Sequence, residues 1–185
     1  MDPLHKLSAC LWLILLVACG GSTDQPTSCS TVVGSRMLSG TVTGVHDGDT
    51  LTLSTGNNLE QVRLQGIDAP ELAQPFGDEA RLLLSKQTLH QAVRVAYTQR
   101  DHYDRILGKV IRQDCTDVNL QLLNQGMAWF YKAYACDLER PRRLLYAAAE
   151  SQASQEHRGL WSQNHPLAPW VFRNGEDPSA AVCAD

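Results

Sequence analysis

Residues 45–71 constrain the fold of this 185-residue chain most strongly, because polar and apolar side chains alternate in two stretches that follow a tight turn. The turn is Asp-Gly-Asp at 47–49, and alternation follows at 50–53 and again at 62–67. This period predicts two neighbouring strands. Arg63 should leave the second strand on the face opposite its apolar neighbours.

The same stretch carries four carboxylates, those of Asp47, Asp49, Asp68 and Glu71. A strand that returns beside the first can bring Asp68 close to Asp49. Paired carboxylates with an arginine nearby suit both a hard cation and a phosphate ester. Taken alone, each fragment also fits an ordinary turn or a strand end. The spacing does not fit an EF-hand loop, whose ligands fall within about 12 residues.

Ordered motifs continue along most of the chain: D-G-D-T, V-R-L-Q-G-I-D-A-P-E, D-H-Y-D-R-I-L-G-K-V, N-L-Q-L-L-N-Q-G-M-A-W and R-G-L-W. Together they resemble the thermonuclease family, whose members contain a staphylococcal-nuclease-like domain. The resemblance covers about residues 38 to 165. It implies a calcium-dependent endonuclease that acts on DNA and RNA.

The resemblance also implies a metal site. Asp49, Asp68 and the backbone carbonyl of Ala69 would bind Ca²⁺, and Asp47 would act behind them or through a bridging water. Because Ala69 would contribute only its carbonyl oxygen, its side chain, where the family often has threonine, need not matter. Glu71 would serve as general base or orient the attacking water.

For the substrate, the resemblance implies that Arg63 and Arg105 clamp the scissile phosphate, and that Tyr103 hydrogen-bonds the terminal phosphate. Guanidinium groups suit this task because they stay charged and bind two phosphate oxygens at once. A second substrate tyrosine of the family aligns with Lys132, and both neighbouring tyrosines, Tyr131 and Tyr134, remain alternatives.

The expected reaction is in-line attack by water, with cleavage of the P–O5′ bond and 3′-phosphate ends. Two other classes stay open: an OB-fold module that binds single strands without cleaving them, and a structural or adhesion lipoprotein. The complete acidic and arginine set argues against both, because unpaired clustered carboxylates are costly to keep.

The pattern of elements predicts an α+β, mainly β fold: a five-stranded OB-fold barrel with about three helices. The expected strands are 38–45, 50–54, 60–66, 92–99 and 106–111. The expected helices are 75–90, 118–124 with Asp117 as N-cap, and 137–157. The family's fold is also an OB barrel, in a domain expected to span residues 36–173.

The N-terminal residues 1–18 have a basic start and an apolar run too short to span a bilayer, as in an export signal. The sequence L-V-A-C resembles a bacterial lipobox, with Cys19 as the lipidated residue; ordinary signal-peptidase cleavage is the alternative. Residues 19–35 would form a flexible tether. We expect an exported monomer, lipid-anchored to a membrane, with the outer membrane favoured by Gly20.

Four cysteines remain after the signal and Cys19: Cys29, Cys115, Cys136 and Cys183. In an oxidising compartment an even number predicts two disulfides. Sequence order favours Cys115 with Cys136 and Cys29 with Cys183, although three pairings are possible. A zinc site is disfavoured, because the chain has no C-x-x-C motif and no suitably spaced pair of histidines.

Charge limits the kind of nucleic-acid binding. Residues 36–173 contain 15 basic and 15 acidic residues, and the acidic excess lies outside them, partly in the tail 174–185. Proteins that coat long duplexes show a strong basic bias. A locally charged site is therefore expected instead.

Overall fold

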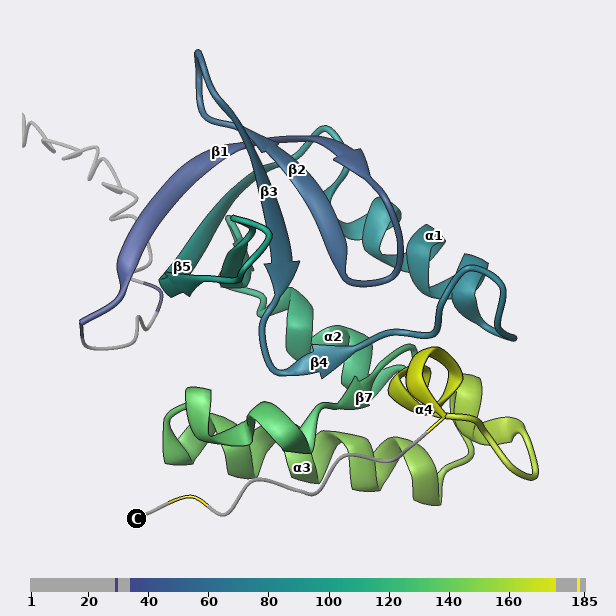
Figure 1. The fold of residues 1–185 in the computed structure, drawn as a ribbon. Helices are drawn as coiled ribbons and strands as arrows, with labels where there is room; N and C mark the ends of the chain where they lie inside the picture. The colour runs from purple at the N-terminus through teal and green to yellow at the C-terminus, as the bar shows by residue number, and fades with distance from the viewer. Residues whose placement is uncertain (1–28, 30–33, 176–182, 184–185) are drawn as a thin grey trace, which may run out of the picture.

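The computed structural model describes residue 29, residues 34–175 and residue 183, and it confirms the five-stranded barrel (Figure 1). The barrel strands are β1 (Arg36–Val45), β2 (Thr50–Ser54), β3 (Leu59–Leu64), β5 (Ala92–Arg100) and β6 (Ile106–Arg112). They follow the order β1-β2-β3-β6-β5, and β5 closes the barrel against β1. Strands β3 and β6 run parallel, and the other neighbours antiparallel. The predicted signal at 1–18 lies outside the described residues, as do most of the predicted tether and tail.

The three expected helices are present as α1 (Gly77–Thr88), α2 (Val118–Asn124) and α3 (Arg140–Gln155). Helix α1 begins two residues after Pro75, because Phe76 adopts a left-handed conformation with φ 69°. The predicted cap of α2 is confirmed, since the Asp117 side chain accepts the N–H of Leu120. Helix α3 starts later than expected, because the 3₁₀ turn η1 (Lys132–Asp137) precedes it.

Besides η1, four short elements were not predicted: β4 (Ile67–Asp68), β7 (Trp129–Phe130), η2 (Gly159–Ser162) and α4 (Pro169–Asn174). They contain two to six residues, too few to show a period in the sequence. Strands β4 and β7 pair with each other below the barrel (Figure 1). Two of these short elements matter for the site, because β4 carries Asp68 and α4 carries Arg173.

Alternate side chains of the strands fill the barrel with an apolar core. Val42, Leu51, Val62 and Ile106 are fully buried there. The parallel pairing of β3 with β6 sets Arg63 beside Leu107 at the barrel surface. The face predicted for Arg63 is therefore confirmed.

A buried asparagine of α2 joins the helix to the ends of β3 and β6. Asn119 donates from Nδ2 to the carbonyls of Gln65 and Gly108, at 3.0 and 3.1 Å, and accepts the N–H of Val110. A buried amide with all these partners fixes the end of β3 just where the chain turns into β4. This is the place from which the site is built.

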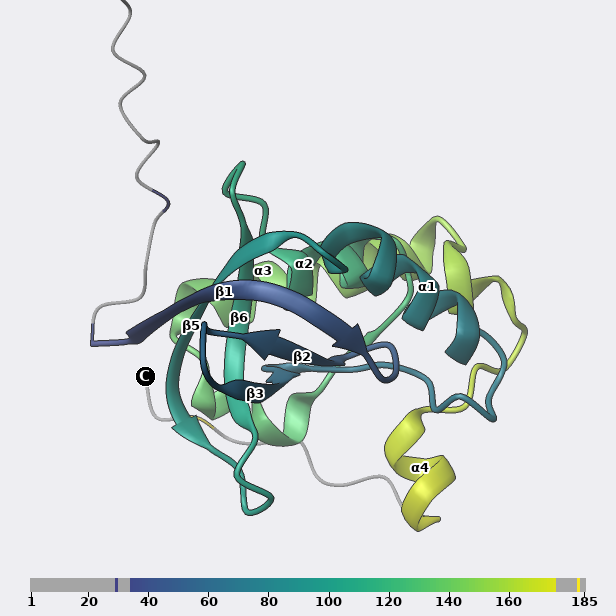
Figure 2. The same ribbon diagram turned by 90° about the horizontal axis from the view of Figure 1, so that it is seen from above.

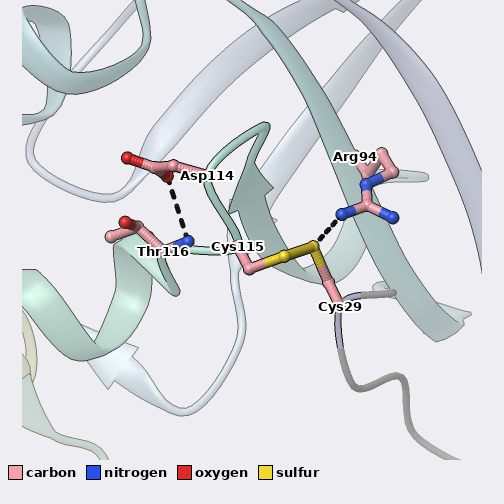
Figure 3. The surroundings of a disulfide bond; sticks show 5 residues. All are labelled: Cys29, Arg94, Asp114, Cys115 and Thr116. Carbon is pink, nitrogen blue, oxygen red and sulfur yellow. Dashed lines mark hydrogen bonds between the residues drawn. A yellow bond between two sulfur atoms is a disulfide. The ribbon is translucent and has the colours of Figure 1, made fainter. Parts of the chain in front are cut away.

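Both disulfides are present, but the pairing favoured above is wrong: Cys29 bonds to Cys115 and Cys136 bonds to Cys183. Figure 3 shows Cys115 on the turn after β6, bonded to Cys29, whose sulfur accepts a hydrogen bond from Arg94 of β5. Cys29 lies in one buried cluster with Ala96 of β5 and Ile111 of β6. Among the described helices none is both long and apolar enough to cross a bilayer.

Helix α4 is held beside β7 by aromatic rings. Trp170 is 7% exposed, stacks on Tyr131 with ring centroids 5.1 Å apart, and meets Trp129 edge-on at 5.6 Å. In the views of Figures 1 and 2, α4 lies below the loop that leads into α1. The C-terminal segment therefore reaches the same rim of the barrel as β4.

Candidate active site

Arg63 lies at the centre of the site, between two buried carboxylates. Its Nη1 is 3.0 Å from Oδ2 of Asp49, and its Nη2 is 2.6 Å from Oδ1 of Asp68. Nη1 also donates to the backbone carbonyls of Leu64 and Ile67. The side chain is 14% exposed, so the guanidinium is fixed by partners on three segments and opens to solvent on one side.

The Asp-Gly-Asp turn presses Asp49 against Ala69 and α1. The N–H of Asp49 donates to Oδ1 of Asp47 at 3.0 Å, and Oδ2 of Asp49 accepts the N–H of Ala69 at 2.6 Å. A Cβ on Gly48 would lie 2.5 Å from the Cβ of Ala69 and 2.7 Å from that of Ala80. This turn therefore needs glycine for close packing.

Asp68 reaches Arg63 because the chain reverses after β3. Gly66 has φ 80°, a left-handed conformation that suits glycine, and the chain then returns as β4 with Asp68 opposite Trp129. Asp68 is 1% exposed. The predicted approach of Asp68 to Asp49 is confirmed, since both contact the same guanidinium.

The two carboxylates carry raised pKa values. Burial raises the pKa of Asp49 to about 8 against the opposing charge of Arg63, and Asp47 and Asp68 add to the rise. Burial also raises the pKa of Asp68, although Arg63 and Arg173 oppose it. Burial thus disfavours the charged form of both carboxylates, and a bound cation would stabilise that form.

Glu71 follows on the loop between β4 and α1. Its N–H donates to Oε1 of Gln74 at 2.9 Å, and its Oε1 lies 2.6 Å from Nη1 of Arg173. The side chain is 36% exposed, so its second oxygen can meet water. This combination suits a carboxylate that orients or activates a water molecule.

Arg173 of α4 was not predicted as a site residue. Its Nη2 lies 2.7 Å from Oδ2 of Asp68, while its Nη1 contacts Glu71. Pro169 at the start of α4 is a recognisable helix signal. The sequence of this six-residue helix nevertheless does not indicate which carboxylates its arginine contacts.

Arg105 approaches from the turn between β5 and β6. Its Nε and Nη2 are each 2.8 Å from Oδ2 of Asp101, and the other oxygen of Asp101 accepts the N–H groups of Tyr103 and Arg105. The guanidinium lies 5.4 Å from the centroid of the Tyr103 ring. Arg105 is thus oriented by its own turn and not by the carboxylates around Arg63.

A cavity of about 800 Å³ joins these groups. The charged residues on its wall include Asp47, Asp49, Arg63, Asp68, Glu71, Arg105 and Arg173. Tyr103, Tyr131 and Tyr134 also line it. Lys132 does not, because its Nζ lies 2.9 Å from Glu150 of α3. The structure therefore brings every predicted site residue except Lys132 to one cavity, and their roles stay predictions.

The carboxylate oxygens of the site are suitable ligands for a hard cation, but the described side chains alone do not supply a complete set of ligands. Within residues 34–175 and the two described cysteines outside them, no three His, Cys, Asp or Glu side chains converge as metal ligands. Calcium accepts backbone carbonyl and water oxygens besides carboxylates. A cation here would therefore use Asp49 and Asp68 together with such oxygens.

A closed OB-type barrel with buried carboxylates around an arginine at its rim defines the class as a nuclease-like barrel protein. The family model of staphylococcal nuclease homologues matches residues 61–163. The chain belongs to this family. The matched segment contains Arg63, Asp68, Glu71 and Arg105, and it ends before α4.

Curated relatives agree with this assignment. An "Uncharacterized endonuclease" of Haemophilus influenzae is 40% identical over 136 residues, which cover 73% of this chain and 72% of the relative. An "Uncharacterized endonuclease" of Escherichia coli is 36% identical over 137 residues, 74% of this chain and 86% of the relative. The "Micrococcal nuclease" of Shigella flexneri is 34% identical over 142 residues, covering 72% and 79%. These relatives support a nuclease function for the chain.

Proposed function

We propose that this protein is a calcium-dependent endonuclease that hydrolyses phosphodiester bonds of DNA and RNA and leaves 3′-phosphate ends. The observation that carries the proposal is Arg63 held between Asp49 and Asp68, with Glu71 on the same cavity. Family membership and the names of the relatives support the hydrolytic class.

The donor set fits Ca²⁺. Asp49 and Asp68 would hold the ion together with the carbonyl oxygen of Ala69, and Asp47 would assist through a water. The burial of the two carboxylates supports this assignment, because burial raises their pKa values and a bound divalent cation would stabilise their charged forms. When bound, a divalent cation neutralises charge on a phosphate oxygen.

The residues of the chain divide the remaining work. Glu71 would orient or deprotonate the attacking water, while Arg63 and Arg105 would meet the negative charge that develops on the phosphoryl oxygens. Removing one fixed donor of this kind typically raises the barrier by about 2.7–4 kcal/mol. The exposed Tyr103 would contact the terminal phosphate, and Tyr131 or Tyr134 the adjoining part of the strand.

The test is cleavage of single-stranded DNA and RNA by the full chain, with Ca²⁺ and with a chelator. Glu71→Gln removes the proposed base, so the rate should fall by roughly 10²–10⁴-fold. Glu156→Gln is the matched control, because Glu156 pairs with Arg158 at the end of α3. End-labelling of the products would reveal whether the phosphate stays on the 3′ end.

Three results would reject the proposal in different ways. Cleavage that persists with the chelator would exclude a metal requirement. Cleavage that survives Glu71→Gln would place the site elsewhere or indicate a contaminant. A folded chain that binds single strands without cutting them would favour the binding module.

The place of action is a second proposal. We infer that the chain is exported and anchored through a lipid on Cys19, facing the periplasm or the cell surface. The two disulfides support export, because they form readily in oxidising compartments. Incorporation of labelled palmitate that is lost in Cys19→Ala would support the anchor, and equal labelling of both chains would reject it.

A further inference from the structure

Asp68 pairs with two guanidinium groups that differ in exposure and in how firmly they are held. Arg63 contacts Oδ1 from β3 and is also bonded to backbone carbonyls. Arg173 takes Oδ2 from α4, and its side chain is 36% exposed compared with 14% for Arg63. If one cation leaves Asp68, Arg173 is therefore the one able to move.

The placement of Arg173 is built into the fold. The buried side chain of Gln74 accepts the N–H of Glu71 with Oε1 and donates from Nε2 to the carbonyl of Leu167 at 2.9 Å. One amide thus ties the loop of Glu71 to the segment that enters α4. Trp170, packed on Tyr131, fixes the helix itself.

Arg173 occupies an oxygen that the proposed cation needs. Its positive charge lies on Asp68, a proposed ligand, and on Glu71, the proposed base. A guanidinium and a divalent cation cannot bind the same carboxylate oxygen at close range without opposing each other. Glu71 offers Arg173 a partner that it can keep when Asp68 is given up.

We propose that Arg173 is a positioning residue of the nuclease site, which holds Asp68 in place of the cation, releases it when the cation binds, and keeps Glu71 oriented during turnover. This inference rests on the proposed function for its second half. Its first half concerns cation binding alone and is measurable without substrate.

The experiment compares the full-length wild type with Arg173→Ala, Arg173→Lys and a control. Calcium affinity is measured by titration calorimetry without nucleic acid, and kcat and KM are measured on single-stranded DNA. Arg112→Ala is the control, because it also removes one positive charge. Arg112 pairs with Asp114 at the far end of β6. Thermal melting without calcium establishes that each variant is folded.

Arg173→Ala should bind Ca²⁺ about tenfold more tightly, since a competing cation is gone, a coupling within the usual range. The same variant should lose about tenfold in kcat, because part of the contribution of a general base depends on its orientation. Arg173→Lys keeps the charge, so its calcium affinity should return to the wild-type value. Its kcat should recover only partly, because a lysine cannot grip two carboxylates with a planar fork.

The sign of the affinity change separates this role from a structural one. Damage to the fold would weaken calcium binding, whereas the proposal requires it to strengthen. Unchanged or weaker binding in folded Arg173→Ala would overturn the inference, even if the wild type cleaves DNA. Tighter calcium binding in Arg173→Ala, together with a folded wild type that does not cleave DNA, would leave the displacement supported and reject the proposed function instead.

Discussion

The inner and outer halves of the site are built in different ways. The inner half consists of Asp49, Arg63 and Asp68, whose side chains are at most 14% exposed; those of Asp49 and Arg63 are also held by backbone groups. The outer half includes Arg105 and Arg173, which are 27% and 36% exposed and bonded mainly through side chains. The inner half is buried where the turn before β2, strand β3 and strand β4 meet, and the outer half lies on the turn between β5 and β6 and on α4.

This difference teaches where stability and catalysis separate. Charges in the inner half compensate each other out of water, so losing one leaves the others buried and unpaired. Charges in the outer half are solvated in part and can be lost at little cost to folding. Variants of the inner half should therefore lower the free energy of unfolding strongly, whereas variants of the outer half should lower the rate of cleavage with little change in stability.

The largest effect on stability is expected from Arg63→Ala. Removing one member of a buried charge cluster costs about 3–5 kcal/mol, here because Asp49 and Asp68 would lose their shared partner. Urea unfolding of the metal-free protein measures this free energy. A loss below about 1 kcal/mol would mean that the inner half does not depend on this guanidinium.

Gly48→Ala should have the next largest effect. A Cβ at this position would overlap Ala69 and Ala80, and overpacking of this kind costs about 1–3 kcal/mol. Gly44→Ala is the matched control in unfolding experiments, because a Cβ there would meet Thr52 only at 3.7 Å. Equal stabilities of the two variants would show that the turn adapts without strain.

Arg105→Ala should have the smallest effect on stability and a large effect on cleavage. We expect the unfolding free energy to change by no more than about 0.5 kcal/mol, as at other surface positions. The rate of cleavage should fall about 10²–10³-fold, the usual effect of losing one preorganised donor. Arg81→Ala, which breaks a surface pair with Asp78 on α1, serves as the control. A stability loss equal to that of Arg63→Ala would abolish the distinction between the two halves.

The inner half was predictable from the sequence because its geometry is local. Period-two alternation fixes the face of Arg63. Asp68 is only five positions further along the sequence, and the reversal at Gly66 brings it into contact with Arg63. The barrel was predictable for the same reason, since each strand is long enough to show its period. The matching of motifs to a known family added the roles of Glu71 and Arg105.

The outer half was less predictable because it depends on contacts between distant segments. Arg173 meets Asp68 across 105 positions of sequence, and no period or motif encodes that distance. Lys132 lies outside the cavity because the 3₁₀ turn η1 directs it to Glu150 and leaves its tyrosine neighbours at the cavity. The disulfide pairing failed likewise, because it depends on which ends the closed barrel brings together.

The disulfides observed here also bear on how such a chain would be made. Each bridge joins one of the four cysteines after Cys19 to the next along the sequence, Cys29 to Cys115 and Cys136 to Cys183. If the chain is exported from its N-terminus, as proposed above, the first pair can be oxidised before the third of these cysteines emerges. An oxidase that joins cysteines in order of arrival would thus produce the native pairs directly, with no need for an isomerase to correct them.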